Sequence, residues 1–389
     1  MSVEYIEKKG TESLKWDYLW KEHGSEDLLP LCTAEMDFDV PDFVRTAAAD
    51  FAMNSRMGLS GAAEQYYESF IAVWKEKHQA DIRPEWIRRA SSVQAAVSRV
   101  ILMATAPEQS VMVLTPETPV LTEPVLRNGR RLITSDLVRS DKGKYLIDFR
   151  RMSKDIEEND VKLMLVSAPH DPCGRVWTAY EMINLMEICS AHGVPVVWDE
   201  TLADFLPGPG RHMSAVSLSD YSQNVISISC PAASFGLCGV QDAVVVIPND
   251  EFRARYTDIA DRLGDRPGST LDMAVLKAAL DKGSEWTDEL CDIIGENYEY
   301  LKTALEEVPG LVVSPLEGGY YLWADFSSVC ETASLLRNFF EEQCRLAPDY
   351  GTAFGGQRFG GFVRFNLATD RSNIIEAAER IRRALDREE

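Results

Sequence analysis

Short apolar runs recur along the first two thirds of the chain, and segments with helical periodicity separate them. The runs are residues 110–114 (SVMVL), 161–167 (VKLMLVS), 194–198 (VPVVW), 224–228 (NVISI) and 243–247 (AVVVI). Short runs that are apolar throughout are typical of strands buried on both faces of a sheet. Their alternation with helical segments between about residues 41 and 247 predicts a mainly parallel sheet covered by helices.

The last third of the chain has a different pattern, which predicts a smaller α+β unit. The expected elements are a long helix over about residues 270–308, strands near 311–313 and 320–324, a helix near 332–344, and a final strand (362–367) and helix. Asp370 is expected to cap that last helix. The glycine-rich residues 355–361 (GGQRFGG) precede a strand and no helix, so they predict a turn and not a nucleotide-binding loop.

Composition and charge narrow the classes of function. The chain has 389 residues, of which 45% are hydrophobic and 26% charged, as is typical of globular proteins. A formal net charge of -22 disfavours nucleic acid and anionic membranes as partners. No secretory leader or spanning apolar stretch is evident, so we expect a cytoplasmic protein. The eight cysteines form no CxxC pair and are expected to be free thiols.

Candidate chemistry gathers directly after the predicted strands. Ligands of open α/β sheets bind beyond the carboxyl ends of the strands. The polar residues and cysteines expected at that edge are Thr118, His170, Asp171, Cys173, Asp199, Glu200, Ser229, Cys230 and Cys238.

Five segments spread over nearly the whole chain share a family pattern. They are residues 34–38 (AEMDF), 65–74 (QYYESFIAVW), 168–178 (APHDPCGRVWT), 198–205 (WDETLADF) and 361–371 (GFVRFNLATDR). Together they resemble the fold-type I PLP-dependent enzymes of aminotransferase class I/II, in the branch of cystathionine β-lyase-like carbon-sulfur lyases. The third segment is the most specific, because it is similar to that branch's NPHNPxGRVWT loop.

The resemblance implies an α/β fold with an aminotransferase-like large domain, whose sheet is mainly parallel, and a smaller α+β C-terminal domain. The expected limits are 1–45 for an N-terminal segment that packs on the small domain, 46–280 for the large domain and 281–389 for the small domain. It also implies a homodimer, because these enzymes build their sites at a dimer interface.

The chain departs from the family where the cofactor is attached. Residues 227–237 (SISCPAASFGL) are similar to the family's SxSKxxNxxGL segment, but Cys230 stands where that segment has the Schiff-base lysine. A thiol cannot form this Schiff base. Met57 and Leu59 stand where the family has the tyrosines of a YGYT turn.

Further cofactor contacts are altered as well. The resemblance places Thr118 where an aromatic ring stacks on the pyridine, Asp171 where an asparagine meets the ring hydroxyl, and Cys238 where a cation meets the phosphate. Ser229 keeps a hydroxyl that can meet the phosphate. Losing one charged hydrogen bond to the phosphate costs ~1.5–3 kcal/mol. We therefore leave the cofactor open and expect PLP to be absent or bound loosely and noncovalently.

Two charged residues of the family pattern are retained. The resemblance implies that Asp199 pairs with a pyridine nitrogen and that Arg364 holds a substrate carboxylate. Ancestry alone also explains Asp199, and an internal salt bridge also explains a buried Arg364.

Cys230 is the candidate nucleophile, with His170 as its general base and Asp199 as a further catalytic group. An inert buried thiol and an inherited His170 are the alternatives. Haem ligated by Cys230 is a minor alternative, with Cys173 and Cys238 nearby. Apart from haem we predict no metal, because no histidine stands at metal-ligand spacing.

Three function hypotheses stay open. The first is a divergent enzyme that acts on a small amino-acid-like carboxylate in specialised biosynthesis, without a Schiff-base lysine. The second is a PLP-dependent lyase or aminotransferase that holds its cofactor noncovalently. The third is a catalytically silent binding subunit.

Overall fold

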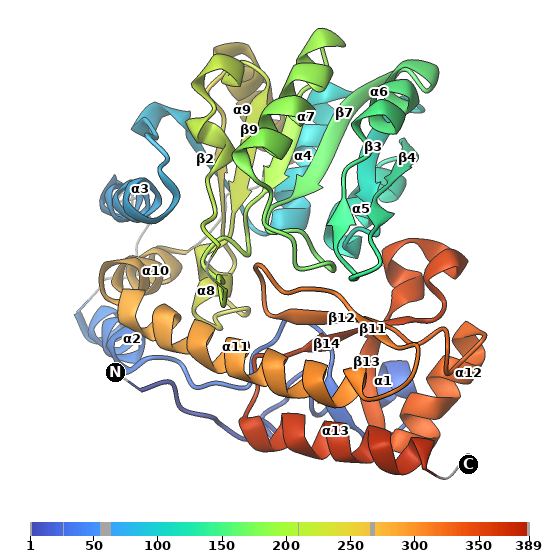
Figure 1. The fold of residues 1–389 in the computed structure, drawn as a ribbon. Helices are drawn as coiled ribbons and strands as arrows, with labels where there is room; N and C mark the ends of the chain where they lie inside the picture. Colours follow the sequence, from blue (N-terminus) through green and yellow to red (C-terminus); the bar gives the residue numbers. More distant parts are fainter. Residues whose placement is uncertain (1, 26, 55–63, 209, 265–268, 387–389) are drawn as a thin grey trace.

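The computed structural model describes residues 2–25, 27–54, 64–208, 210–264 and 269–386. The positions of Met57 and Leu59 lie outside these ranges. The described chain forms two main sheets with helices around them, which confirms the predicted α/β fold (Figure 1).

The large sheet has seven strands in the order β2-β10-β9-β8-β7-β3-β4. Their bounds are β2 (Ile87–Ala90), β3 (Ser110–Thr115), β4 (Arg131–Asp136), β7 (Val161–Ser167), β8 (Val196–Asp199), β9 (Val225–Ser229) and β10 (Ala243–Val246). The strands from β9 to β4 are parallel, whereas β10 is antiparallel to both of its neighbours. The two edge strands, β2 and β4, were not predicted from the sequence, because charged and polar side chains interrupt their apolar pattern.

Helices cover both faces of this sheet, so its central strands are buried on both sides. Met112 and Leu114 of β3 pack in one core cluster with α6 (Phe149–Glu158) and α7 (Ala179–Ala191). Val111 and Val113 pack in a second cluster on the opposite face. That second face carries α4 (Val93–Ala104), α5 (Pro119–Arg127) and α9 (Asp250–Leu263). Burial on both sides explains why the strands read as continuous apolar runs.

The small sheet has five strands in the order β1-β13-β14-β12-β11. The bounds are β1 (Leu29–Leu31), β11 (Val312–Val313), β12 (Tyr321–Asp325), β13 (Leu346–Tyr350) and β14 (Phe362–Asn366). In Figure 1, α11 (Ser284–Glu306) and α13 (Arg371–Leu385) lie side by side along this sheet. Asp370 caps α13 by accepting a hydrogen bond from the Ser372 backbone. β1 pairs with β13, so part of the N-terminal segment lies in the small sheet, and the division at 1–45, 46–280 and 281–389 stays a proposal.

The long helix expected over residues 270–308 is divided at Gly283 into α10 (Thr270–Lys282) and α11. A side chain at Gly283 would have its Cβ 2.0 Å from the Phe235 ring, so the break lets this ring pack against the helices. The remaining elements are α1 (Trp20–His23), α2 (Asp42–Asn54), α3 (Glu64–His78), α8 (Pro231–Ser234), α12 (Ala333–Asn338), β5 (Val138–Arg139) and β6 (Tyr145–Leu146). Of the helices in the described ranges, none is both long enough and apolar enough to cross a membrane.

Candidate functional site

A cavity of about 580 Å³ lies between the carboxyl edge of the large sheet and the start of β12. Strand ends and the loops after them line one side, and tyrosines of the small sheet line the other. The wall includes Thr118, Asp171, Asp199, Cys230, Tyr320 and Tyr321. The volume is in the range of small-molecule sites, and the place is where α/β sheets bind their ligands.

Asp199 ends β8 and presents a carboxylate to this cavity. Its residue is 6% exposed. Its Oδ1 accepts hydrogen bonds from the Thr201 hydroxyl (2.5 Å) and the Thr201 backbone N–H (3.1 Å). Its Oδ2 has no donor within the part of the chain that the structure describes. Burial raises the pKa of Asp199 to about 6, although the hydrogen bonds from Thr201 act in the opposite direction.

Glu200, the next residue, is a structural group. Its carboxylate accepts hydrogen bonds from the Ser214 hydroxyl (2.8 Å), the Ser227 hydroxyl (2.7 Å) and the Ala215 backbone N–H (2.7 Å). Burial alone would raise the pKa of Glu200, but His212 and these hydrogen bonds lower it. Of these two neighbouring carboxylates, that of Glu200 is therefore satisfied within the protein, and that of Asp199 faces the cavity.

Arg364 of β14 is held by two carboxylates of the protein itself. Its Nη1 donates to both oxygens of Asp171 (2.8 and 2.6 Å), and its Nε and Nη2 donate to Asp349 Oδ2 (3.0 and 2.6 Å). Its guanidinium carbon also lies 3.8 Å from the centre of the Tyr321 ring. A substrate carboxylate, the role expected from the resemblance, could reach this guanidinium only by displacing one of these partners.

Cys230 lies after β9 and lines the cavity. Its thiol donates to the Asp242 carbonyl at 3.2 Å. Burial raises the pKa of this thiol to about 12, and the negative charges of Asp242 and Asp199 add to that effect. The thiol is thus held protonated at neutral pH, which makes it a poor nucleophile.

The structure does not bring His170 to Cys230. The His170 ring is buried edge-on against Trp177 (5.3 Å between ring centres), and its Nε2 lies 3.7 Å from Glu117 Oε2. Burial lowers the pKa of His170 to about 3 and raises that of Glu117 well above its usual value. We read this contact as one between neutral groups. Cys173 is also buried outside the cavity wall, and burial raises its pKa well above the usual value.

The other predicted contacts divide between the wall and the interior. Thr118 and Cys238 line the cavity, and Thr118 caps α5 by accepting from the Val120 backbone. The Cys238 thiol lies 3.8 Å from the Ala34 carbonyl. Ser229 is fully buried, and its hydroxyl has no hydrogen-bond partner among the described residues.

A buried ion pair that the sequence did not predict lies behind Cys230. Asp242 precedes β10 and lines the cavity, where Arg89 Nη2 of β2 lies 2.6 Å from its Oδ1. The Tyr66 hydroxyl donates to its other oxygen. An arginine inside a strand is the one feature of the sequence that could have indicated this ion pair. It went unused because β2 itself was not predicted.

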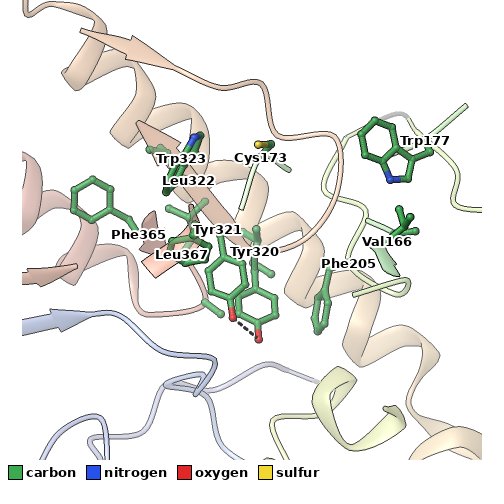
Figure 2. Close-up of a cluster of buried hydrophobic side chains, with 14 of the residues drawn as sticks. Val166, Cys173, Trp177, Phe205, Tyr320, Tyr321, Leu322, Trp323, Phe365 and Leu367 are labelled. Atoms are coloured by element: carbon green, nitrogen blue, oxygen red, sulfur yellow. Dashed lines mark hydrogen bonds between the residues drawn. The ribbon is translucent and has the colours of Figure 1, made fainter. Parts of the chain in front are cut away.

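Two tyrosines of the small sheet were also missed, although residues 320–324 were expected to form a strand. Figure 2 shows their rings next to each other, with the hydroxyl groups close together. The Tyr321 hydroxyl donates to the Tyr320 oxygen (3.1 Å), and the Tyr320 hydroxyl donates to the Ala34 carbonyl (3.0 Å). The Tyr320 ring also packs edge-on against Phe205, 4.9 Å away. These rings reach the cavity only because the small sheet lies across the cavity from the large sheet.

The residues of the cavity fit PLP in part. Asp199 Oδ2 fits a protonated ring nitrogen, and the first turn of α4, capped by Ser92, offers backbone N–H groups. However, the described lining contains no lysine, arginine or histidine, so it offers no amine to an aldehyde and no cationic side chain to a dianionic phosphate. Asp171 adds a negative charge. These residues do not fit a covalently anchored PLP.

The cysteines do not assemble a metal site. Among the residues that the structure describes, no group of three histidine, cysteine, aspartate or glutamate side chains is placed to hold a metal ion. Cys230 and Cys238 share the cavity wall, but Cys173 does not belong to it.

Comparisons with known proteins agree with the fold. A family profile described as aminotransferase class I and II matches residues 26–381. The chain is 28% identical to cystathionine beta-lyase PatB of Bacillus subtilis (strain 168) over 97% of this chain and 98% of that protein. It is 25% identical to protein MalY of Escherichia coli (strain K12) over 95% and 94%, respectively.

Among solved structures, cystalysin from Treponema denticola, which contains a pyridoxal 5'-phosphate cofactor, superposes with a TM-score of 0.95 at 26% identity. The match covers 100% of both chains. These similarities extend over both sheets and the cavity between them. The chain therefore belongs to the aminotransferase class I and II family.

Proposed function

We propose that this chain is a small-molecule enzyme of its family that works without a Schiff-base lysine and uses Asp199 as its proton-transfer group. The observation that carries the proposal is the uncontacted Oδ2 of Asp199, which faces a cavity of about 580 Å³. A pKa of about 6 suits a group that gives and takes protons near neutral pH. Cys230 then serves as a neutral part of the wall and not as the nucleophile.

Noncovalent PLP chemistry is the second candidate, because cystalysin contains this cofactor and matches the whole chain. The two candidates differ in what the purified protein should retain. We expect an absorbance spectrum of the fresh protein to show no cofactor band, and added PLP to be lost on desalting. A stoichiometric aldehyde band that survives desalting would establish the second candidate, and a Soret band would establish haem ligation.

The enzymatic role can be tested without knowing the substrate. Wild-type protein is incubated with a metabolite extract, and mass spectrometry follows which compounds are consumed or formed. Asp199→Asn should slow these changes by about 10²–10⁴-fold, the usual share of a general acid or base. Glu117→Gln makes the same acid-to-amide change outside the cavity wall and should leave them intact. If the wild-type protein changes no compound, the chain is a binding protein and the proposal fails.

The assembly and location are proposals that rest on the resemblance and on composition. We propose a homodimer in the cytoplasm. Light scattering coupled to size-exclusion chromatography would give the mass of the assembly, and a monomeric mass at micromolar concentration would contradict the dimer.

A further inference from the structure

One end of the cavity, around Asp171 and Asp199, offers hydrogen-bond acceptors and few donors. We name the four side chains there, Asp171, Asp199, Tyr320 and Tyr321, the acceptor wall. The hydroxyl protons of both tyrosines are already donated, one to the other ring oxygen and one to the Ala34 carbonyl. What they leave for a ligand is oxygen lone pairs. The uncontacted Oδ2 of Asp199 adds a further acceptor.

The charge of this end is negative as well. Asp171 and Asp349 share the single guanidinium of Arg364, so one carboxylate charge remains unbalanced there. Asp199 adds a second negative charge when it is ionised, because its hydrogen-bond partners among the described residues are the neutral groups of Thr201. Asp242 is balanced by Arg89 and changes nothing. An anion that entered this end would meet two excess negative charges on largely buried side chains.

The rest of the cavity is apolar enough to hold the body of a ligand. Val93 and Val120 line it from the large-sheet side, and Leu202 and Val240 come from the loops after β8 and α8. Small-molecule sites commonly combine such apolar surface with a few polar groups that fix orientation.

We propose that the acceptor wall binds a protonated amine, and that the ligand is a small organic amine with an apolar body and no free carboxylate. The inference rests on the proposed function in one respect, that this cavity is the working site. An ammonium group donates hydrogen bonds and carries the positive charge that the wall lacks. Asp199 Oδ2 is its direct partner.

The absence of a free carboxylate follows from the state of Arg364. Beside the acceptor wall, this arginine is the cationic side chain that the carboxylate of a zwitterionic amino acid would have to pair with, and the amino acid would have to remove a carboxylate that makes two hydrogen bonds of 2.8 and 2.6 Å. The displaced Asp171 would then be left buried without its cation, which is strongly unfavourable. An amine whose carboxylate is missing or masked meets no such penalty.

Three probes with one shared body test this charge preference. They are 2-phenylethylamine, a cation; L-phenylalanine, a zwitterion; and 3-phenylpropionate, an anion. Isothermal titration calorimetry on the full chain should show the amine binding at least about tenfold more tightly than either of the others, the size of effect expected for one charged hydrogen bond.

Two variants and one control variant test whether the acceptor wall causes this charge preference. Asp199→Asn should weaken binding of 2-phenylethylamine about tenfold, because the partner loses its charge. Glu117→Gln is the matched control: Glu117 is equally buried but is protonated and outside the wall, so it should change nothing. Asp171→Asn should free Arg364 in part and bring L-phenylalanine binding closer to that of the amine.

The pH dependence gives an independent readout. The acidic groups around Asp199 are Asp171, Glu200, Cys230 and Glu117. The negative charges of Asp171 and Glu200 oppose its ionisation, whereas the Cys230 thiol is neutral in this pH range and burial disfavours the charged form of Glu117. The amine stays protonated throughout, so its affinity should rise roughly tenfold between pH 5 and pH 7 as Asp199 ionises with a pKa of about 6. Asp199→Asn should remove this rise.

Each outcome separates the two proposals. Equal binding of the three probes, no binding of any, or tighter binding of 3-phenylpropionate overturns the amine proposal. If PLP is then lost on desalting and Asp199→Asn still abolishes turnover of some metabolite, the proposed function stands without it. Stoichiometric retention of PLP overturns the proposed function, whatever the probes show.

Discussion

Asp199 lines the cavity, and Arg364 is held by Asp171 of the same wall; both are less than 10% exposed, yet their hydrogen-bond partners differ. Arg364 makes four hydrogen bonds to two carboxylates, and the rings of Tyr321 and Phe354 lie 3.8 and 4.7 Å from its guanidinium carbon. Among the residues that the structure describes, Thr201 alone donates hydrogen bonds to Asp199, and both go to a single oxygen.

The difference indicates which group is structural and which is free to act. A buried charge with every donor or acceptor satisfied stabilises one arrangement of the chain and has little left for a ligand. A largely buried carboxylate whose pKa is raised by burial costs stability when it is ionised, and proteins tolerate such costs mainly at functional sites. The burial of the two side chains is similar, so only their partners distinguish them.

The largest effect on stability is expected from removing the guanidinium of Arg364. Arg364→Met leaves Asp171 and Asp349 facing each other without compensation and should lower the free energy of unfolding by about 3–5 kcal/mol at pH 7. Urea denaturation followed by circular dichroism measures this. Combining it with Asp171→Asn should restore part of the loss. A loss below about 1 kcal/mol would show that Arg364 is not a structural group.

Removing the charge of Asp199 should change the free energy of unfolding in the opposite direction. The pKa of Asp199 is raised from 3.8 to about 6, so wild-type stability falls as the pH rises through that interval. Asp199→Asn keeps the oxygen that accepts from Thr201 and should be more stable than wild type by up to roughly 3 kcal/mol at pH 8, with no gain below about pH 4. Thermal unfolding of both proteins across this pH range measures the difference. Lower stability of the variant at pH 8 would reveal a cation beside Asp199.

The smallest effect is expected at Cys230, whose neutral thiol lines the cavity together with Asp199. Cys230→Ala removes one weak hydrogen bond and a small apolar volume, so unfolding should change by less than about 1 kcal/mol. Binding of 2-phenylethylamine should also persist. If this variant lost all turnover while it kept binding, the thiol would be a catalytic group after all, and Asp199 would not act alone.

Much of the fold could be predicted from local pattern. The runs at residues 110–114 and 161–167 are apolar throughout because helices cover both faces of their strands, and burial of that kind is visible in the sequence. The edge strands β2 and β4 could not be found in this way, because their exposed or charged positions break the run. The helix break at Gly283 depends on the Phe235 ring, which belongs to a distant segment.

The candidate site shows the same division between local and long-range information. The sequence by itself determined that Asp199 and Cys230 follow buried strands, and therefore that they stand at the edge where such sheets bind ligands. Only the tertiary structure decided that Asp171 pairs with Arg364, 193 positions later in the chain. It also decided that Oδ2 of Asp199 has no donor among the described residues. The reason is physical: strand patterns follow from local burial, whereas the partner of a buried charge depends on which two sheets meet across the cavity.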